Sequence, residues 1–500
     1  MTLTRINRKI ISIISSRKFF YFVIAFFVFQ AVWLALAYNY PMGYDEDYHL
    51  GLIKLYSHYW LPFFSTQPDD VNQFGQIVRD PSYLYHYLLS FPYRIVGLFT
   101  SNNVYQEGIF RFLNIGLFTL SLIFFKKLFN YLKVSNALSN SLLFIYILLP
   151  ISAFLGAQSN YDNLLLVLTP LTILYSARAL NNLANKKELP IKDLVLWFSL
   201  ACLACLTQYI FLVIFVGQFI FISYRLFKNY RQPNSIKIKD WSKSISRLSM
   251  LNKLFLGTFL SLCIGLFVAM YGYNTFKYHT PIPSCDQVID VEDCYAYSPY
   301  WRNQVYLQVK DKYPLKNIVL YGQNWSHTMT YSYFFSLAKV GDKYYGLPPL
   351  PVPEWTAVIV SSLGVVLLLK YYRTVFTKKL INRYLLFVTV FYTLILFLYN
   401  YYEYTVYHQE VAVQGRYLMP LLLIVIYLLS LGYKQYFNLH KNYYKGIFVC
   451  LVFMCLIYGG GASAFIIRHQ DTWLWNNSTV NTLTNDVQNV LKPIVLGSYF

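Results

Sequence analysis

Long apolar blocks alternate with short polar segments along all 500 residues of the chain. The blocks hold about 15–22 residues each, close to the roughly 20 residues that an α-helix needs to cross a bilayer. We therefore predict an all-α integral membrane protein with about eleven membrane-spanning helices. The predicted spans cover residues 19–38, 109–125, 139–156, 162–178, 193–207, 208–224, 253–271, 354–371, 384–402, 416–432 and 446–467.

One further apolar segment, residues 82–99 ("SYLYHYLLSFPYRIVGLF"), decides how the spans are counted. Counting it as a span would place Lys126 and Lys127 on the outer side and would invert every span that follows. The segment also contains His86 and Arg94. We therefore predict a helix that lies in the outer membrane interface, with one apolar side.

This count leaves three long segments on the outer side of the membrane. The first outer loop is predicted over residues 39–108 and the second, larger one over residues 272–353, while the tail 468–500 is also outside. No internal repeat and no low-complexity linker interrupts the chain. Residues 1–500 are therefore predicted to form a single polytopic membrane domain.

The distribution of charge sets the orientation of these spans. Charged residues make up only 13% of the chain, and its net charge is +20. Lys and Arg gather at the N-terminus and in short loops, which the positive-inside rule places in the cytoplasm. Of the 22 acidic residues, only Glu188, Asp193 and Asp240 fall on that side. We predict a protein of the cytoplasmic membrane with its chemistry at the outer face. The basic residues form no stripe with exposed aromatics, which argues against a nucleic-acid partner.

Three consecutive carboxylates follow the first apolar block, in "YDEDYHL". Neighbouring carboxylates repel one another, and partly desolvated ones suit a general base or a metal site. Asp45 and Glu46 are therefore candidate catalytic residues. His49 lies three residues after Glu46 and shares its face if the segment is helical. The alternative is that these acids only end a helix in the headgroup layer.

Three other predicted spans begin with a charged residue on the outer side. Asp162 opens the fourth span in "GAQSNYDNLLLVLTP", where it is either a second functional carboxylate or a helix cap. Arg111 and Arg416 open the second and tenth spans, against the positive-inside trend. Arginine there can bind a lipid phosphate through two parallel hydrogen bonds, or can simply extend toward the headgroups. His86 and Arg94 add outer positive charge.

The cysteines show no spacing typical of a metal site. Cys202 and Cys205 form a CxxC inside an apolar segment, where packing is the expected role. Cys285 and Cys294 share one polar loop, "CDQVIDVEDC", and could close a small ring. A disulfide there would place this loop in an oxidising compartment.

In the order and spacing of these motifs, the chain resembles the GT-C superfamily of polytopic glycosyltransferases. That superfamily includes protein O-mannosyltransferases, aminoarabinose transferases and oligosaccharyltransferase catalytic subunits. The motifs are Asp45-Glu46 with His49 in a D-E-x-x-H spacing, the stretch "DPSYLYHYLLSFPYR", Arg111, Asp162 and "QGRYLMP" with Arg416. The loop 272–353 matches no specific enzyme, and the tail 468–500 is shorter than the soluble domain of some members. The acceptor therefore stays open.

The resemblance implies a GT-C-like core and inverting transfer of a sugar from a polyprenyl-phosphate donor to a glycan, lipid or protein acceptor. Asp45 would take the proton from the acceptor hydroxyl. Glu46 and Asp162 would orient the acceptor or hold a divalent ion, which is possible but not required. The leaving lipid phosphate would be stabilised by Arg111 and Arg416. The predicted substrate-binding set is Arg111, Arg416, His49, His86 and Arg94.

Three other functions stay open. A transporter or flippase for a lipid-linked or amphipathic solute would place ionisable residues or broken helices near the bilayer midplane. The span centres are almost free of ionisable residues, and only Pro150, Pro170 and the run Gly459–Gly461 hint at breaks. A polymerase or ligase for lipid-linked glycans would share the outer arginines. A non-catalytic protein that binds the lipid carrier would need no base.

Overall fold

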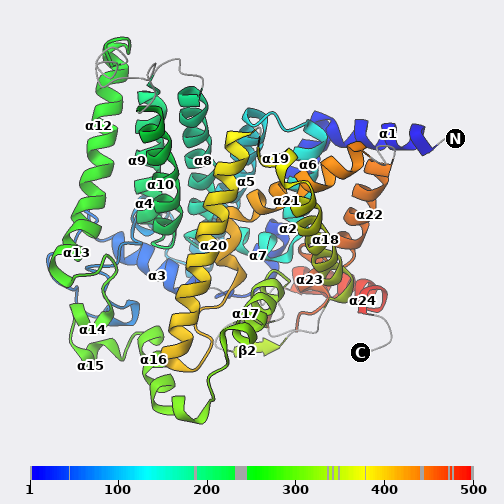
Figure 1. The fold of residues 1–500 in the computed structure, drawn as a ribbon. Helices are drawn as coiled ribbons and strands as arrows, with labels where there is room; N and C mark the ends of the chain where they lie inside the picture. Colours follow the sequence, from blue (N-terminus) through cyan, green and yellow to red (C-terminus); the bar gives the residue numbers. More distant parts are fainter. Residues whose placement is uncertain are drawn as a thin grey trace.

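The chain folds almost entirely into α-helices, as Figure 1 shows for a computed structural model. The structure describes residues 3–43, 45–184, 189–230, 245–334, 337–340, 343–346, 350–377, 379–439, 444–470, 473–475 and 478–496. The described strands are β1 (Leu337–Val340) and β2 (Lys343–Gly346), which form one antiparallel hairpin. The predicted all-α class is thus confirmed apart from this hairpin. Glu188 and Asp240 lie outside the described residues.

The helices that build the body of the molecule are long and mostly continuous. They are α1 (Leu3–Ser15), α2 (Arg17–Ala37), α5 (Asn103–Tyr131), α6 (Asn136–Leu148), α7 (Pro150–Gly156), α8 (Asp162–Ala184), α9 (Ile191–Thr207), α10 (Phe211–Tyr230), α12 (Met250–Phe267), α18 (Pro351–Lys370), α20 (Leu380–Tyr407), α21 (Met419–Leu439) and α22 (Lys445–Ile457). Helix α12 continues through a π-helical turn into α13 (Tyr273–Tyr278). The shorter helices α19 (Tyr372–Phe376), α23 (Ser463–Ile466) and α24 (Ser478–Leu496) lie around them.

Within the described residues, eight helical segments are long and apolar enough to cross a membrane. They are α2, α5, α8, α10, the continuous helix Met250–Tyr278, α18, α20 and the segment Gly415–Leu439. The pair α6–α7, bent by 75°, raises the total to nine if it counts as one span. The bend falls at Pro150, which begins α7 and cannot donate a backbone hydrogen bond to α6.

Each of the eleven predicted spans corresponds to helix in the structure. The predicted spans 193–207 and 446–467 correspond to α9, with 17 residues, and α22, with 13 residues. Both are shorter than the eight long segments. A membrane protein with several spanning helices is therefore confirmed, whereas the count of eleven stays a prediction.

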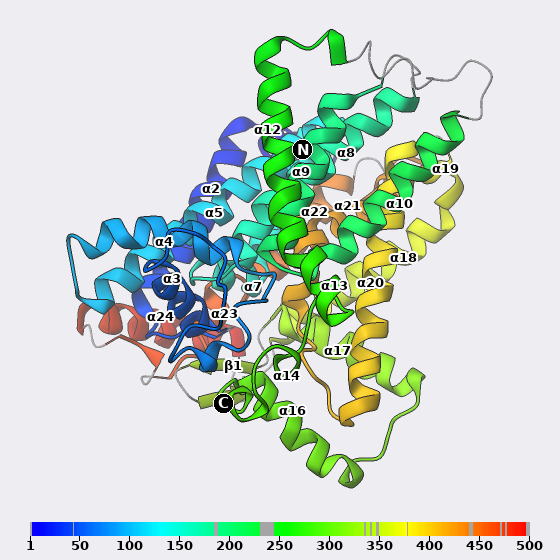
Figure 2. The ribbon, with the colours of Figure 1, turned by 90° about the vertical axis from the view of Figure 1, so that its left-hand side faces the viewer.

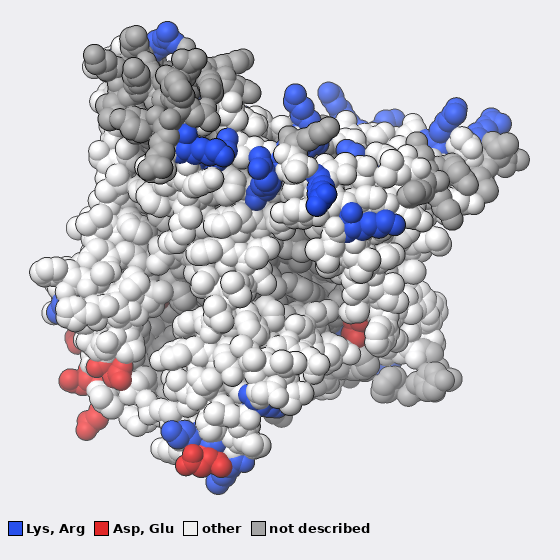
Figure 3. Space-filling view, in the orientation of Figure 1, with Lys and Arg blue, Asp and Glu red and all other residues white. Residues whose placement is uncertain are grey.

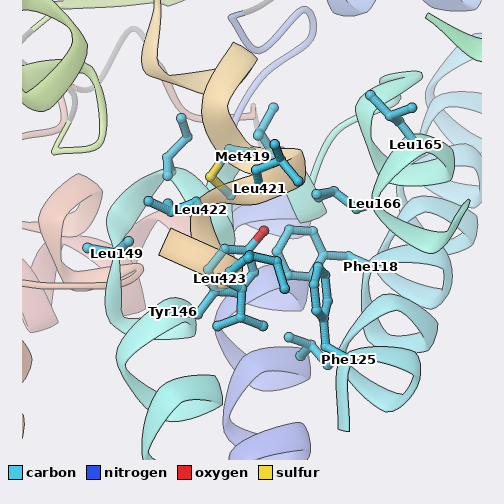
Figure 4. Packing of buried hydrophobic residues seen from close by; sticks show 14 of the residues in the cluster. Phe118, Phe125, Tyr146, Leu149, Leu165, Leu166, Met419, Leu421, Leu422 and Leu423 are labelled. Atoms are coloured by element: carbon cyan, nitrogen blue, oxygen red, sulfur yellow. The ribbon is translucent and has the colours of Figure 1, made fainter. Parts of the chain in front are cut away.

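The centre of the helical body is filled by aromatic and aliphatic side chains from helices far apart in the sequence. Figure 4 shows Phe118 of α5 and Tyr146 of α6 next to leucines of α8 and α21. The rings of Phe118 and Tyr146 stack with their centroids 5.8 Å apart, and Phe118 also stacks on Phe27 of α2 at 4.5 Å. Such pairs add to the burial of apolar area that holds the helices together.

The charged side chains separate toward the two ends of the helices. Figure 3 shows Lys and Arg gathered at the end where α1 and α19 lie, while the visible Asp and Glu lie toward the opposite end, mixed there with some basic residues. We call these the basic end and the acidic end. The sequence predicted the same arrangement, with the basic residues on one side of the spans and most acidic residues on the other.

Both predicted outer loops lie toward the acidic end. The first carries α3 (Glu46–Tyr56), the 3₁₀ turn η1 (Asn72–Phe74) and α4 (Leu84–Gly97). The second carries α13, α14 (Cys285–Val288), α15 (Val291–Cys294), α16 (Ser298–Val309), the turn η3 (Lys310–Lys312) and α17 (Ile318–Ser332). Figure 1 shows α14 and α16 at the end opposite to α1, and Figure 2 shows both helices well below the N-terminus. Helix α4 has 14 residues and is too short to span a bilayer, which agrees with the prediction that residues 82–99 are not a span.

The two loops are tied to each other by contacts and by a covalent ring. Gln76 donates a hydrogen bond to the Pro283 carbonyl at 2.8 Å. Gly75 has a φ of +76°, and a Cβ there would stand 3.0 Å from the Tyr297 ring, so the close approach of the loops depends on this glycine. Cys285 and Cys294 are joined by a disulfide that closes the loop before Tyr297.

Candidate active site

The three consecutive acids at the start of α3 have three different surroundings. Asp45 is the N-cap residue, in the left-handed conformation with φ +66°, and its side chain makes no capping hydrogen bond. Glu46 is buried, and Asp47 is exposed. Asp45 therefore does not serve to cap the helix. A non-glycine residue held in this conformation is uncommon and is found more often at functional positions.

Glu46 and Arg111 form a buried ion pair that joins the first outer loop to α5. Arg111 donates from Nε to Glu46 Oε1 at 2.9 Å and from Nη2 to Oε2 at 2.8 Å, with both side chains about 1% exposed or less. The three remaining N–H groups of Arg111 donate to the carbonyls of Ala35, Tyr38 and Asn39. Ala35 belongs to the last turn of α2, and Tyr38 and Asn39 follow the end of that helix, so one guanidinium holds α2, α3 and α5 together.

Like the guanidinium of Arg111, the carboxylate of Glu46 makes several hydrogen bonds, with two donors at each oxygen. Oε2 also accepts from the Met42 amide at 2.8 Å, and Oε1 accepts from the Ser159 amide at 3.2 Å. A phosphate could reach Arg111 only by breaking hydrogen bonds in a buried site, which is costly. These contacts favour structural roles for Glu46 and Arg111, while the catalytic role of Glu46 and the phosphate contact of Arg111 stay predictions from the sequence.

Asp45 and Arg416 form a second ion pair of a different kind. Arg416 Nη2 lies 3.1 Å from Asp45 Oδ2. The arginine side chain is 5% exposed, whereas the aspartate side chain is 55% exposed and faces solvent at the acidic end. Arg416 belongs to the 3₁₀ turn η4 (Gly415–Leu418), and a Cβ on Gly415 would clash with the Met329 carbonyl at 2.6 Å. The turn therefore packs closely against α17, and this contact fixes the position of Arg416.

Asp162 lies on the buried side of the same pair. Its side chain is 2% exposed, and Arg416 interacts electrostatically with both Asp45 and Asp162. Oδ2 of Asp162 is buried and has no hydrogen-bond partner among the described residues. Asp162 begins α8, where the helix dipole favours a negative charge. The structure thus brings the two predicted acids Asp45 and Asp162 together around Arg416.

The segment that carries Asp162 is held by buried amides that the sequence reading did not single out. Asn163 donates from Nδ2 to Asn114 Oδ1 and to the Leu155 carbonyl, each at 2.9 Å. Asn114 Oδ1 also accepts from the Tyr85 hydroxyl at 3.0 Å. Asn114 lies one helical turn after Arg111 on the same face of α5, so the i, i+3 spacing was an available signal.

Aromatic and amide side chains surround the acids and Arg416. Tyr161 and Tyr417 lie within electrostatic range of the Arg416 guanidinium, and the Gln208 amide is within hydrogen-bonding reach of Asp162 and Tyr161. Tyr297 of the second outer loop lies close to Asp45, and burial raises the pKa of its hydroxyl. These hydroxyl and amide groups suit the binding of a polyhydroxylated ligand. No sequence motif indicated these residues. The chain holds 49 tyrosines, so a tyrosine near a helix end does not stand out.

His49 and His86 form a buried pair beside this group. Nδ1 of His49 and Nε2 of His86 are 2.9 Å apart, and the two rings stack. One of these two nitrogens must donate a hydrogen bond and the other must accept it. Protonating the accepting nitrogen would break this hydrogen bond, so a positive charge on both rings is unfavourable. Burial lowers the pKa of His86 to about 3, and burial together with His86 and Arg416 lowers the pKa of His49 well below its usual range. Both are neutral at pH 7, and the structure places them behind the acids as a packed pair.

Arg94 lies away from this group. It donates to the carbonyls of Tyr56 and Tyr59, and its guanidinium stacks on the Trp60 ring at 4.2 Å. These contacts join α4 to the end of α3. The contacts recorded for Arg94 among the described residues are therefore outside the acid–arginine group, and its place among the substrate-binding residues stays a prediction.

The donor set at the site does not fit a divalent ion. Glu46 is occupied by Arg111, which leaves Asp45 and Asp162 as the carboxylates, with the positive charge of Arg416 between them. Within the part of the chain that the structure describes, no three His, Cys, Asp or Glu side chains are grouped as metal ligands. Cys202 and Cys205 are buried free thiols in α9.

The chain matches no protein-family model, no curated protein and no solved structure.

Proposed function

We propose that the chain is a membrane glycosyltransferase that moves a sugar from a polyprenyl-phosphate donor to an acceptor hydroxyl, with inversion at the anomeric carbon. One observation carries the proposal. A half-exposed carboxylate, Asp45, is held by a buried arginine, Arg416, and a second carboxylate, Asp162, lies behind them with a buried oxygen that has no partner among the described residues. Acids and an arginine at the end of apolar helices suit a reaction on a lipid phosphate.

Each residue of this group takes one role. Asp45 accepts the proton of the acceptor hydroxyl, because its side chain is open to solvent and makes no capping bond. The hydroxyl oxygen then forms the new bond to the anomeric carbon as the bond to the lipid phosphate breaks. Arg416 stabilises the negative charge that grows on the departing phosphate. Asp162 accepts a hydrogen bond from a sugar hydroxyl through Oδ2.

The assigned topology gives the proposal its setting. The N-terminus and the basic end lie in the cytoplasm, the acidic end faces outward, and the eleven helical segments cross the membrane in a GT-C-like core. The donor lies in the outer leaflet, with its phosphate at Arg416. The acceptor, whether glycan, lipid or protein, approaches beneath the second outer loop.

A transporter is the second candidate, and the bent pair α6–α7 favours it. Broken helices in transporters bring helix ends to a solute near the midplane. Here the segment after α7 instead supplies the Ser159 amide to Glu46 and leads into Asp162, so the break serves to position the acidic site. Glycosyl transfer therefore accounts for more of the geometry.

The test uses membranes that carry the wild-type chain or Asp45→Asn at equal amounts. Each is given a panel of radiolabelled polyprenyl-phosphate sugars, and the label that leaves the lipid fraction is followed. We expect transfer from one donor by the wild type, and a rate lower by about 10²–10⁴-fold for Asp45→Asn. Equal rates would remove Asp45 from the mechanism. Binding of donors without any release would favour a carrier-binding or transport role.

A further inference from the structure

A long cavity separate from the acid–arginine group opens between α1, α6, α18, α21 and α22. Its volume is about 530 Å³, within the roughly 300–1,000 Å³ range of ligand sites. Its wall on α21 runs from Leu422 to Phe437, which corresponds to roughly 22 Å along the helix axis. Since a bilayer's hydrocarbon core is about 30 Å thick, the cavity is long enough for one leaflet of lipid.

The walls of the cavity are apolar and partly built from small side chains. Val360, Leu429 and Val449 are typical of the lining. Ser362 of α18 and Ser430 of α21 also line it, and their small size leaves room that larger residues would fill. Figure 3 shows a hollow in the face of the molecule beside α18. The chemistry of this lining suits a hydrocarbon chain.

The two ends of the cavity differ in charge. At the basic end it is lined by Lys434 and Lys445, whose ammonium groups repel each other, and Lys379 adds to the repulsion on Lys434. Neither lysine belongs to an ion pair recorded among the described residues, and Lys445 donates a hydrogen bond to the neutral Asn438 side chain. At the other end the lining is uncharged and includes Leu149 and Tyr333. An anion between the lysines would relieve the repulsion.

We propose that this cavity binds one anionic glycerophospholipid, with its phosphate between Lys434 and Lys445 and an acyl chain running toward Leu149 and Tyr333. The headgroup lies at the end of the molecule opposite to Arg416, so the occupant is distinct from the proposed sugar donor. The proposal needs no glycosyl transfer and stands whether or not the chain is an enzyme.

The uncharged end of the cavity lies next to α17, the helix that the turn carrying Arg416 contacts. Thr330 and Tyr333 line the cavity and flank Ser332, whose hydroxyl accepts a hydrogen bond from the Gly415 amide. Gly415 precedes Arg416. A lipid in the cavity therefore packs against the end of α17, the helix that the turn carrying Arg416 contacts.

The test is native mass spectrometry of the full chain in detergent, titrated with phosphatidylglycerol, phosphatidylcholine or a polyprenyl phosphate. We expect the wild type to bind one phosphatidylglycerol in preference to both other lipids. Lys434→Gln with Lys445→Gln should weaken this binding by roughly 30-fold, since each lysine near an anionic headgroup contributes about fivefold. The matched control, Lys127→Gln with Lys228→Gln, removes two exposed lysines that do not line the cavity and should leave binding unchanged.

A second variant tests the apolar part of the cavity without altering charge. Ser430→Phe fills the space beside α18 and should also reduce phosphatidylglycerol binding at least tenfold. If this variant does not fold, the lysine pair and its control still decide the question. Equal binding by the lysine variant and its control, equal binding of phosphatidylcholine, or preferred binding of the polyprenyl phosphate in the cavity would each overturn the proposal.

Discussion

Two acid–arginine pairs begin at neighbouring residues and differ in almost every physical respect. In the pair of Glu46 and Arg111, both groups are buried, and all five N–H groups of the arginine donate to protein acceptors. In the pair of Asp45 and Arg416, the carboxylate is half exposed, and one contact of 3.1 Å joins the two groups. Saturated hydrogen bonding suits a structural joint. An open carboxylate suits chemistry, because a substrate can reach it.

The contrast shows how little the residue types alone decide. Both acids lie at the start of the same helix, α3. Arg416 lies in the turn that precedes α21, whereas Arg111 lies inside α5, which begins at Asn103 and not at Arg111 as the sequence predicted. What separates them is the exposure of the two carboxylates, since the Glu46 side chain is 1% exposed and the Asp45 side chain is 55% exposed. If the contrast is right, substitutions in the first pair should act on folding, and substitutions in the second should act on turnover.

The largest effect is expected from Arg111→Met. This change leaves the Glu46 carboxylate buried without its partner and strands three carbonyls, so we expect a loss of about 3–5 kcal/mol in the free energy of unfolding. Thermal unfolding in detergent and the yield of folded protein measure it. Arg111→Lys should rescue little, because one ammonium cannot replace a two-pronged contact. Wild-type stability in Arg111→Met would show that the pair is dispensable.

Asp162→Asn tests the buried side of the second pair. The amide keeps the size of the carboxylate but removes its charge and one acceptor next to Arg416. Because hydrogen bonds to charged groups contribute about 1.5–3 kcal/mol, we expect transfer to slow by roughly 10–150-fold. The initial rate at saturating donor gives the answer, with circular dichroism to verify folding. An unchanged rate would make Asp162 a helix-start residue only.

The histidine pair predicts a dependence of stability on pH that separates packing from chemistry. The folded-state pKa of His86 is about 3 and that of His49 is also lowered, while the unfolded values are about 6.5. Their contribution is therefore present above about pH 6.5 and is lost as the pH falls toward the folded values. Between pH 7 and pH 5, the buried imidazole of His86 should cost about 2 kcal/mol, and His49 should add a loss of the same sign.

Unfolding temperatures of the wild type and of His49→Gln with His86→Gln, measured from pH 7 to pH 5, test this dependence. The wild type should lose more stability than the variant. Burial raises the pKa of Asp80, which acts in the opposite direction and is common to both proteins. Parallel curves for the two proteins would contradict the assignment of a neutral buried pair.

The smallest effect is expected from Arg94→Gln. The change removes a stacking contact with Trp60 and hydrogen bonds to two carbonyls in a partly exposed place. We expect a loss of about 1 kcal/mol in stability and a transfer rate within roughly twofold of the wild type. A loss of transfer comparable with that of Asp162→Asn would place Arg94 among the substrate-binding residues.

Much of the fold could be predicted from the sequence, because apolar length and basic loops follow directly from the physics of a bilayer. The helical segments and the short α4 were found in this way. The bend at Pro150 and the short α9 and α22 were less predictable, since packing against neighbouring helices decides how far an apolar segment extends.

The candidate site could be predicted only in part. Asp45, Asp162 and Arg416 were selected from their positions at helix ends, and the structure brings them together. Glu46 and Arg111 were selected by the same rule, but they are 65 residues apart, and their mutual saturation is visible only in three dimensions. Tyr161 and Gln208 carry no local signal at all.

The most direct test compares Asp45→Asn with Glu46→Gln, for both the unfolding temperature and the transfer rate per folded molecule. We expect opposite results for the two variants. Asp45→Asn should stay close to the wild-type unfolding temperature, because the Asp45 side chain is 55% exposed and Asp162 still offsets the charge of Arg416. It should lose at least about a hundredfold in rate. Glu46→Gln should unfold at a much lower temperature, while the molecules that remain folded transfer at nearly the wild-type rate. A stable Glu46→Gln protein without transfer, beside a fully active Asp45→Asn, would contradict the account.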